Sequence, residues 1–81
     1  MRKFKTGTKD IKDNGAIKRT EKTKIQFEKG EHVLIDNVEA VYDMTRCIPL
    51  SETMVLPFFL FNKLDGKPYS MTRDNYLEEI V

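Results

Sequence analysis

The stretch MVLPFFLFNKLDGKPYSM, residues 54–71, is the most hydrophobic part of the chain and decides its fold. Its aromatic and branched side chains favour strands, and they predict a core strand over residues 58–63. Asp65-Gly66 is typical of a type I′ turn, because a two-residue hairpin of this kind needs positive φ. Residues 67–71 are then expected to return as the partner strand of a hairpin.

Two prolines constrain where this hairpin can lie. Pro57 precedes the predicted strand, and Pro68 lies in its partner. Proline has no amide hydrogen to donate to a ladder, so both residues are expected at an edge, a bulge or a strand start. Prolines on facing strands imply an exposed rim.

The segment before this hairpin predicts further strands. Residues 32–43, HVLIDNVEAVYD, are interpreted as two strands around a tight turn at Asp36-Asn37. Apolar and polar residues alternate over 25–27, which predicts the first core strand there. Residues 44–53 contain a proline and show no clear period, so they are expected to form a loop and a candidate binding element.

The C-terminal residues 72–80 favour a short helix that packs back on the sheet. Thr72 can cap it, and Tyr76, Leu77 and Ile80 form an apolar edge at helical spacing. Two glutamates follow near its C-terminal end, where the helix dipole disfavours acids. The helix is therefore expected to be short or of the 3₁₀ type.

Charge and hydrophobicity are segregated along the chain. Residues 1–24 hold nine Lys or Arg and three Asp or Glu, a net charge of +6, whereas residues 25–81 hold five and ten, a net charge of −5. The 81 residues allow one domain. We therefore expect a basic, partly flexible N-terminal arm over 1–24, with folding after residue 24, and a small domain over 25–81.

The arm has a composition that permits disorder. Against this, Asp13-Asn14-Gly15 is a strong tight-turn signal flanked by Ile11 and Ile17. A short hairpin at the fringe of the domain is the alternative to a loose arm.

The single cysteine and the length of the longest apolar stretch indicate in which cellular compartment the protein is expected. Cys47 is the single cysteine, so the chain offers neither an internal disulfide nor a thiolate zinc site, which fits a reducing environment. The longest apolar stretch, residues 54–61, is far shorter than the roughly 20 residues of a spanning helix. We expect a soluble, cytoplasmic protein.

The order of these elements resembles that of small SH3-like β-barrels. The residues that carry the resemblance are a KGEHVLI strand entry at 29–35, a hairpin, a long loop, the LDGK turn at 64–67, and a final LEEI at 77–80. The resemblance covers residues 25–81 and implies a binding module for peptide or nucleic acid. The expected fold class is thus mainly β, either an SH3-like barrel or a curled antiparallel sheet with a short C-terminal helix.

Residues that could carry catalysis are sparse. Cys47 and His32 can act as nucleophile and base only if they lie close together in the fold. The structural alternative is an imidazole at the start of a strand for His32 and a small loop thiol for Cys47. The acids Asp36, Asp43, Asp65 and Asp74 lack a metal-loop spacing and are interpreted as turn and cap residues. We expect neither an enzyme nor a bound metal or cofactor.

The basic arm predicts nucleic-acid binding, RNA or DNA, because Lys and Arg neutralise phosphates and threonine hydroxyls can bond their oxygens. The alternative is a solvated tail that serves solubility. The candidate residues are the cations of the arm, Lys3, Lys5, Lys9, Lys12, Lys18, Arg19, Lys22 and Lys24.

A second hypothesis is a protein-interaction or inhibitory module that acts through the acidic body. The apolar, proline-interrupted run could be offered to another chain at a sheet edge. Its candidate interface residues are Arg46, Phe59, Phe61 and Tyr69. Such a chain would be an accessory protein, for example of the phage or mobile-element type, that binds nucleic acid or a nucleic-acid-handling host protein, and opposite charges at its two ends would also permit homo-oligomers.

Overall fold

The strand β5 (Met54–Lys63) is the centre of the sheet in the computed structural model, which describes residues 1–7 and 15–80. It pairs antiparallel with β4 (Val38–Pro49) from Lys63 back to Val55. Its other edge is shared by two strands, β2 (Ile17–Lys18) and β6 (Pro68–Arg73). The most hydrophobic run of the sequence therefore has sheet neighbours on both sides.

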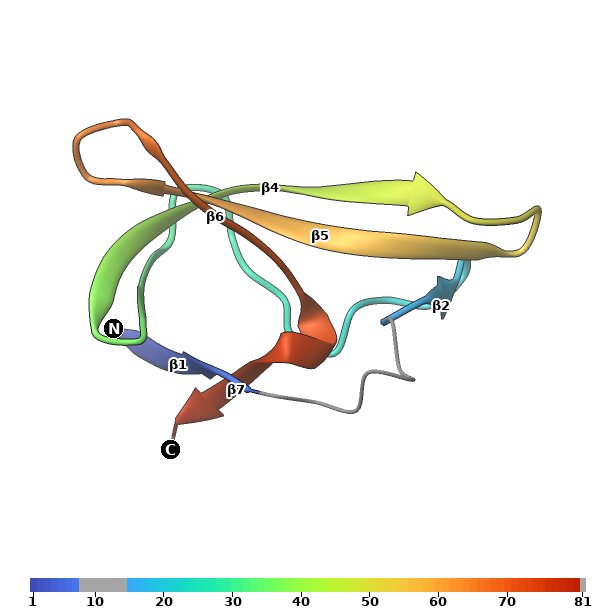
Figure 1. Ribbon diagram of the computed structural model, residues 1–81, viewed down its shortest axis with the longest axis horizontal. Coiled ribbons are helices and arrows are strands. Elements are labelled where there is room, and N and C mark those ends of the chain that lie inside the picture. Colours follow the sequence, from blue (N-terminus) through green and yellow to red (C-terminus); the bar gives the residue numbers. More distant parts are fainter. Residues whose placement is uncertain (8–14, 81) are drawn as a thin grey trace.

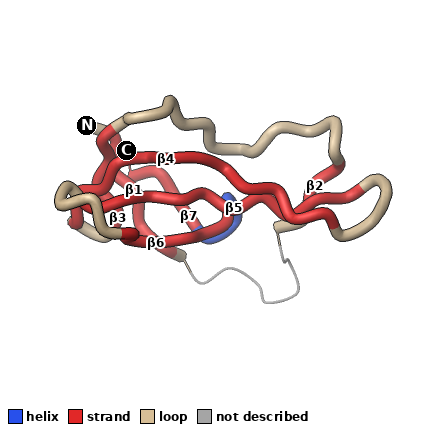
Figure 2. The backbone as a smooth tube through the Cα atoms, turned by 90° about the horizontal axis from the view of Figure 1, so that it is seen from above, coloured by secondary structure: helices blue, strands red, loops and turns tan. Residues whose placement is uncertain are grey.

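The remaining strands extend the sheet beyond β4. β3 (His32–Ile35) pairs antiparallel with β4, β1 (Arg2–Thr6) runs parallel to β3, and β7 (Leu77–Ile80) is antiparallel to β1. The order is β2-β5-β4-β3-β1-β7, with β6 beside β5. The sheet curls into a half-barrel, from which β4 and β5 run out as a long hairpin (Figure 1, Figure 2).

The hydrophobic core lies inside the curl. Its buried members come from β1, β3, β4, β5, β7 and the connecting segment 19–31; they are Phe4, Ile25, Val33, Ile35, Ala40, Phe59, Phe61 and Leu77. Phe27 sits among them, with its ring centroid 5.1–5.2 Å from those of Phe4, Tyr42, Phe59 and Phe61. Tilted, stacked and edge-on aromatic pairs of this kind add to the stabilisation from area burial.

The Asp36-Asn37 turn confirms the predicted hairpin between β3 and β4. Both residues have positive φ, 51° and 67°, as a type I′ turn requires. The Asp36 carboxylate also accepts hydrogen bonds from the Thr6 hydroxyl and backbone amide, and these bonds lower the pKa of Asp36. The turn thereby fastens the end of β1 to the hairpin.

The N-terminal residues are part of the fold, which corrects the expectation that folding begins after residue 24. Phe4 is 1% exposed, and β1 lies between β3 and β7. The parallel pairing of β1 with β3 joins residues about 30 positions apart, so no local pattern announces it. Most of the predicted turn at 13–15 lies outside the described residues; Gly15 has φ +84°.

The segment 25–27 is not a strand, although its two apolar side chains face the core as the alternation indicates. Ile25 is buried and Phe27 packs against the core, but neither residue belongs to a ladder. The backbone is held by the Asp74 carboxylate instead, which accepts hydrogen bonds from the Lys24 amide at 2.5 Å and the Ile25 amide at 2.9 Å.

The predicted loop at 44–53 is wrong over most of its length. β4 continues to Pro49, after a bulge between Tyr42 and Met44, because residues 55–60 of β5 supply partners for its backbone. Only the four residues 50–53 connect the two strands. The bulge shifts the side-chain alternation, which hid the strand from a search for period-two patterns.

The expected C-terminal helix is not formed, apart from one turn of the 3₁₀ type. A single 3₁₀ turn, η1 (Asp74–Tyr76), follows β6, and the chain then pairs with β1 as β7. Thr72 caps nothing here, since the residue at the N-cap is Arg73. The glutamates that disfavour a helix end lie on a strand, where Glu78 is beside Lys5.

One proline expectation and one turn type need correction. Pro68 begins β6 beside a register shift in its pairing with β5, as expected. Pro57 is buried inside β5 rather than exposed at a rim. On the edge of β5 away from β4, Pro57 falls between the pairing with β2 at Val55 and with β6 at Phe58, so no strand is in register with it on that edge. On the other edge it lies opposite Cys47 of β4. The turn before β6 has positive φ at Gly66 but not at Asp65, which excludes type I′.

None of the helical segments in the described ranges is long and apolar enough to cross a membrane.

Asp74→Ala is expected to lower the free energy of unfolding by about 2–3 kcal/mol, because two amide hydrogens beside the core lose a charged acceptor. Glu52→Ala, at the exposed hairpin tip, is the matched control and is expected to change stability by less than about 0.5 kcal/mol. Urea denaturation followed by far-UV circular dichroism measures both values. Equal stability of the two variants would contradict the role assigned to Asp74.

Candidate interaction surface

The β5 strand is apolar on both of its faces. Side chains alternate along a strand, and Val55, Pro57, Phe59 and Phe61 are buried toward the inside of the curl. The alternate side chains, Leu56, Phe58 and Leu60, point to the opposite side and are only half-buried. A strand with one buried and one solvated face would carry polar residues at these positions.

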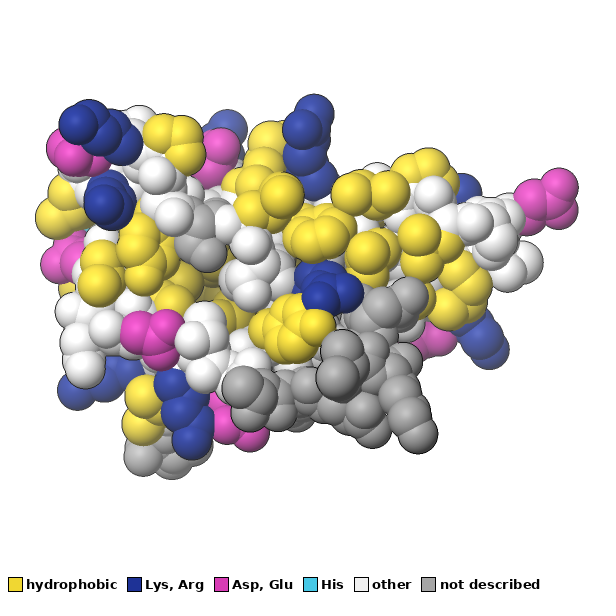
Figure 3. Space-filling view, in the orientation of Figure 1, with side chains coloured by type: hydrophobic (Ala, Val, Ile, Leu, Met, Phe, Trp, Pro, Cys, Tyr) yellow, Lys and Arg dark blue, Asp and Glu magenta, His cyan; other side chains and the backbone are white. Residues whose placement is uncertain are grey.

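The neighbouring strands continue this second face in register. Leu60 is flanked by Met44 of β4 and Met71 of β6, Phe58 by Arg46 and Arg73, and Leu56 by Ile48 of β4. We call these eight residues the outer face: Met44, Arg46, Ile48, Leu56, Phe58, Leu60, Met71 and Arg73. Figure 3 shows hydrophobic side chains gathered along the β4–β5 hairpin, with Lys and Arg side chains among them.

Several outer-face side chains are unusually exposed for their type. Met71 is 59% exposed, Met44 48% and Ile48 46%. Leu50, at the start of the hairpin turn, is 48% exposed and extends the apolar surface toward the tip. Contiguous apolar surface on a small protein marks a contact site more often than single exposed residues do.

The charges of the outer face are of one sign. Arg46 and Arg73 flank Phe58, and no Asp or Glu occurs among the eight residues. The Arg73 guanidinium lies 4.1 Å from the centroid of the Tyr76 ring, a cation–π contact that orders it. The face therefore combines an apolar floor with two arginines, although the body as a whole is acidic.

The predicted nucleic-acid residues are spread over separate places. Lys3 and Lys5 lie on β1, where the Lys5 ammonium is 3.4 Å from the Glu78 carboxylate. Arg19 donates to the carbonyls of Ser51 and Glu52 and so ties the β4–β5 turn to the segment after β2. The remaining described members, Lys18, Lys22 and Lys24, are exposed, and Lys9 and Lys12 lie outside the described residues.

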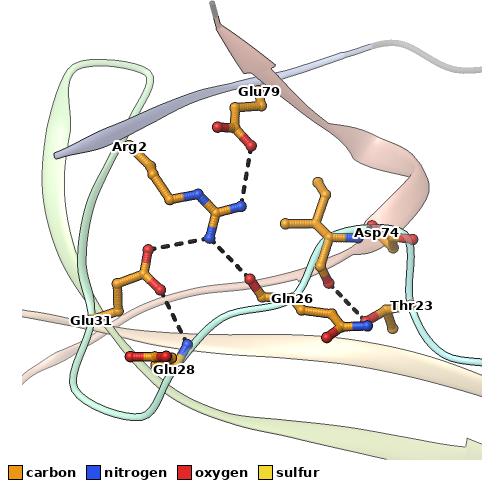
Figure 4. A network of polar contacts seen from close by, with 8 residues as sticks. Arg2, Thr23, Gln26, Glu28, Glu31, Asp74 and Glu79 are labelled. Atoms are coloured by element: carbon orange, nitrogen blue, oxygen red, sulfur yellow. Dashed lines mark hydrogen bonds and ion pairs between the residues drawn. The ribbon is translucent and has the colours of Figure 1, made fainter.

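Arg2 is a cation of the arm that serves the fold. Its guanidinium donates to the Gln26 carbonyl at 2.9 Å, to Glu31 at 3.2 Å and to Glu79 at 3.1 Å (Figure 4). The hydrogen bond to Glu79 is the main cause that raises the pKa of Arg2. This group also covers the rings of Phe4 and Phe27, at 5.1 and 5.3 Å from their centroids.

The predicted protein-interface residues divide between surface and interior. Arg46 is exposed on the outer face. Phe59 and Phe61 are 1% and 2% exposed in the core, so they do not lie on the surface as expected. Tyr69 is half-buried against the core, and its hydroxyl donates to the Ile35 carbonyl at 3.4 Å.

Sequence reasoning missed most of the outer face. The run MVLPFFLF is apolar at every position, so a strand over these residues is apolar on both faces. This pattern predicts a buried strand or an edge strand, and the loop expected over residues 44–53 provides no partner strand that would extend it into a surface. Ile48 and Met44 could be placed beside Leu56 and Leu60 only after β4 was extended to Pro49.

The two residues considered for catalysis lie apart in the sheet. His32 begins β3, and its Nδ1 atom is 3.0 Å from a Glu39 carboxylate oxygen across the hairpin. Cys47 lies on β4 opposite Pro57 and is exposed. In the part of the chain that the structure describes, no group of three His, Cys, Asp or Glu side chains is arranged to hold a metal ion.

Comparisons with models of protein families, with curated proteins and with solved structures found no match to this chain.

The two faces of β5 are expected to respond differently to truncation. Phe59→Ala removes a buried ring and should lower the free energy of unfolding by about 3–5 kcal/mol, whereas Phe58→Ala should cost about 1 kcal/mol because its ring is half-exposed. Chemical denaturation of the two variants measures the difference. Equal losses would mean that Phe58 is a core residue and that the outer face is not free.

Proposed function

We propose that this protein is a non-enzymatic binding module and that it docks a protein partner on the outer face. The observation that carries the proposal is the double-sided apolar strand β5, whose outward residues Leu56, Phe58 and Leu60 continue into Met44, Ile48 and Met71. Such a surface is costly to leave in water and gains free energy when another chain covers it. Met, Arg and aromatic residues are also enriched in protein interfaces.

The arginines define the chemistry of the partner. A surface that fits the row Arg46, Phe58, Arg73 presents an apolar group to the Phe58 ring and a carboxylate to the exposed Arg46 guanidinium. The partner is therefore a protein segment that combines apolar and acidic side chains. Arg46 is exposed, so its charge also steers an acidic partner toward the face.

A second copy of the chain is a poor occupant of this face. Two outer faces placed against each other bring the exposed Arg46 of one copy near that of the other, and none of the eight outer-face residues carries a carboxylate. Like charges desolvated in an interface cost several kcal/mol. The charge pattern favours a different protein.

The half-barrel belongs, in our proposal, to the SH3-like type of small barrel, whose members are commonly binding modules. Its support is the order of elements: the β3–β4 hairpin, the β5–β6 hairpin and a short turn before the last strand. We further propose an accessory role, of the kind phages and mobile elements encode, in a reducing cytoplasm where an exposed Cys47 stays a thiol.

A photo-crosslinking side chain at position 58 is expected to trap the partner in cells that produce the protein. The same group at position 67, on the exposed β5–β6 turn, is the control and is expected not to trap that partner. Affinity of the purified partner should fall at least tenfold for Arg46→Glu, where a salt bridge becomes a repulsion, and stay within twofold for Lys67→Glu. Titration calorimetry gives both values. The same products from both positions, or none from position 58, would contradict the proposal.

Nucleic-acid binding through the arm is the second candidate function. Its support is that Lys18, Lys22 and Lys24 are exposed on one continuous segment. Phosphates would neutralise these lysines, whereas Lys5 and Arg2 already contact carboxylates.

Changing Lys18, Lys22 and Lys24 to Glu is expected to abolish binding to labelled RNA or DNA, and the salt slope of any residual binding should be shallower by about 2–3. Arg19 stays unchanged because it holds the β4–β5 turn. The control converts Lys29, Lys63 and Lys67, which lie elsewhere on the surface. Fluorescence anisotropy over a salt series measures both, and equal binding by the two triple variants would rule out the arm as a nucleic-acid site.

A further inference from the structure

One edge of β4 carries no strand over the outer half of the hairpin. β3 pairs with β4 only as far as His32 and Val41, and the backbones of Gly30 and Glu31 add one bond each to Tyr42. From residue 44 to Pro49, β4 pairs with β5 along one edge. Its other edge, which continues the side paired with β3, has no backbone partner among the described residues. An unpaired edge of this kind is a template for strand addition.

The alternation of ladder bonds tells which groups the free edge offers. The Leu50 amide donates to the Met54 carbonyl at the end of the hairpin. In an antiparallel pair, bonded and non-bonded positions alternate, so Ile48 and Arg46 bond to β5 while Thr45 and Cys47 direct their amides and carbonyls away from it. Pro49 falls in the same set as Thr45 and Cys47, and its missing amide hydrogen breaks no bond to β5.

A hollow of about 310 Å³ lies on the inner side of this edge. Its floor is apolar, formed by Cys47, Val55 and Pro57 of the hairpin together with Ile17. Its rim on the segment after β2 carries Arg19, Glu21 and Lys22, two cations and one acid. Side chains of an added strand that point inward would enter this hollow, and those that point outward would lie beside Arg46 and Ile48 of the outer face.

We propose that an extended segment of the partner protein adds to the free edge of β4 along Thr45–Pro49, antiparallel or parallel, as an eighth strand of the sheet. This inference rests on the proposed protein-binding function and specifies its mode. The backbone of the segment bonds to Thr45 and Cys47, and its side chains alternate between apolar and acidic. The apolar side chains point inward to the floor of the hollow, and the acids point outward to Arg46 of the outer face.

A second copy fits this edge less well than such a segment. Two β4 edges paired antiparallel about Cys47 place both Arg46 side chains on one face, diagonal to each other and with no carboxylate among the outer-face residues. Diagonal neighbours in a sheet are close enough for long side chains to interact. The charges therefore favour a heterologous, acidic strand, and a dimer is the competing outcome.

The test uses the full chain and a synthetic probe, an acetylated and amidated heptapeptide of alternating Glu and Val. Two-dimensional NMR spectra should show shifts confined to residues 43–49 and their neighbours. The exchange of the Thr45 and Cys47 amides should slow at least tenfold at saturating peptide, while the amides of Arg46 and Ile48 are protected before and after. The same peptide with Lys in place of Glu should bind at least fivefold more weakly.

Proline at the two edge positions separates backbone pairing from side-chain contact. Thr45→Pro with Cys47→Pro removes two edge donors that make no bond to β5, so the sheet should stay folded by circular dichroism and peptide affinity should fall at least tenfold. Thr45→Ala with Cys47→Ala removes the same side chains, including the Thr45 hydroxyl bonded to the Tyr42 hydroxyl, and keeps the amides. This control should bind within twofold of the parent.

Three results would overturn strand addition. They are shifts on the outer face without a change at the Thr45 and Cys47 amides, equal loss of affinity in the Pro and Ala variants, and a dimer by light scattering whose edge amides are already protected. If crosslinking from position 58 still traps a specific partner in any of these cases, protein binding stands and only its mode fails. If both experiments fail, the proposed function falls as well.

Discussion

The structure depends on the pairing of β5 with three other strands. β4 covers one of its edges, and β2 and β6 divide the other, so this one strand joins the elements before and after it in the chain. The division leaves a gap at residues 56–57, and Pro57 occupies it. A residue that cannot donate a ladder bond is thus accommodated within the most heavily paired strand, because the neighbour that would need the bond is absent there.

Side-chain acceptors replace sheet bonds where the chain is irregular. The segment 19–31 crosses the open side of the half-barrel without forming a strand, and it still delivers Ile25 and Phe27 to the core. The Asp74 carboxylate accepts hydrogen bonds from the Lys24 and Ile25 amides of this segment. The Arg2 guanidinium donates to the Gln26 carbonyl next to them (Figure 4). Backbone groups outside a ladder still need hydrogen-bond partners where they are taken from water. Here a carboxylate and a guanidinium from distant parts of the chain supply them.

The half-barrel contains the stabilising core, whereas the projecting hairpin carries the proposed interface. The curled part holds the aromatic cluster around Phe27, whereas the projecting part of β4 and β5 exposes apolar residues on one face and a free edge beside it. Phe59 and Phe58 are consecutive, yet one belongs to the core and the other to the proposed interface. The same stretch of sequence therefore serves both purposes through the two faces of a strand.

The local features of the fold could be predicted from the sequence. Asp36-Asn37 specifies a type I′ turn because both residue types tolerate positive φ, and the flanking alternation specifies β3 and the first half of β4. The strand over 58–63 followed from its composition. Each of these features depends on residues less than about ten positions apart, and so the pattern in a short window contains the information.

Only the tertiary structure decided the rest. The pairing of β1 with β3 and β7 joins segments 30 and more than 70 residues apart, and it turned part of a basic arm into core. The chain end became a strand because β1 offered it an edge, which outweighed a weak helical pattern. The outer face likewise exists only through the register of β4, β5 and β6, since the identity of a surface depends on which side chains a ladder places side by side.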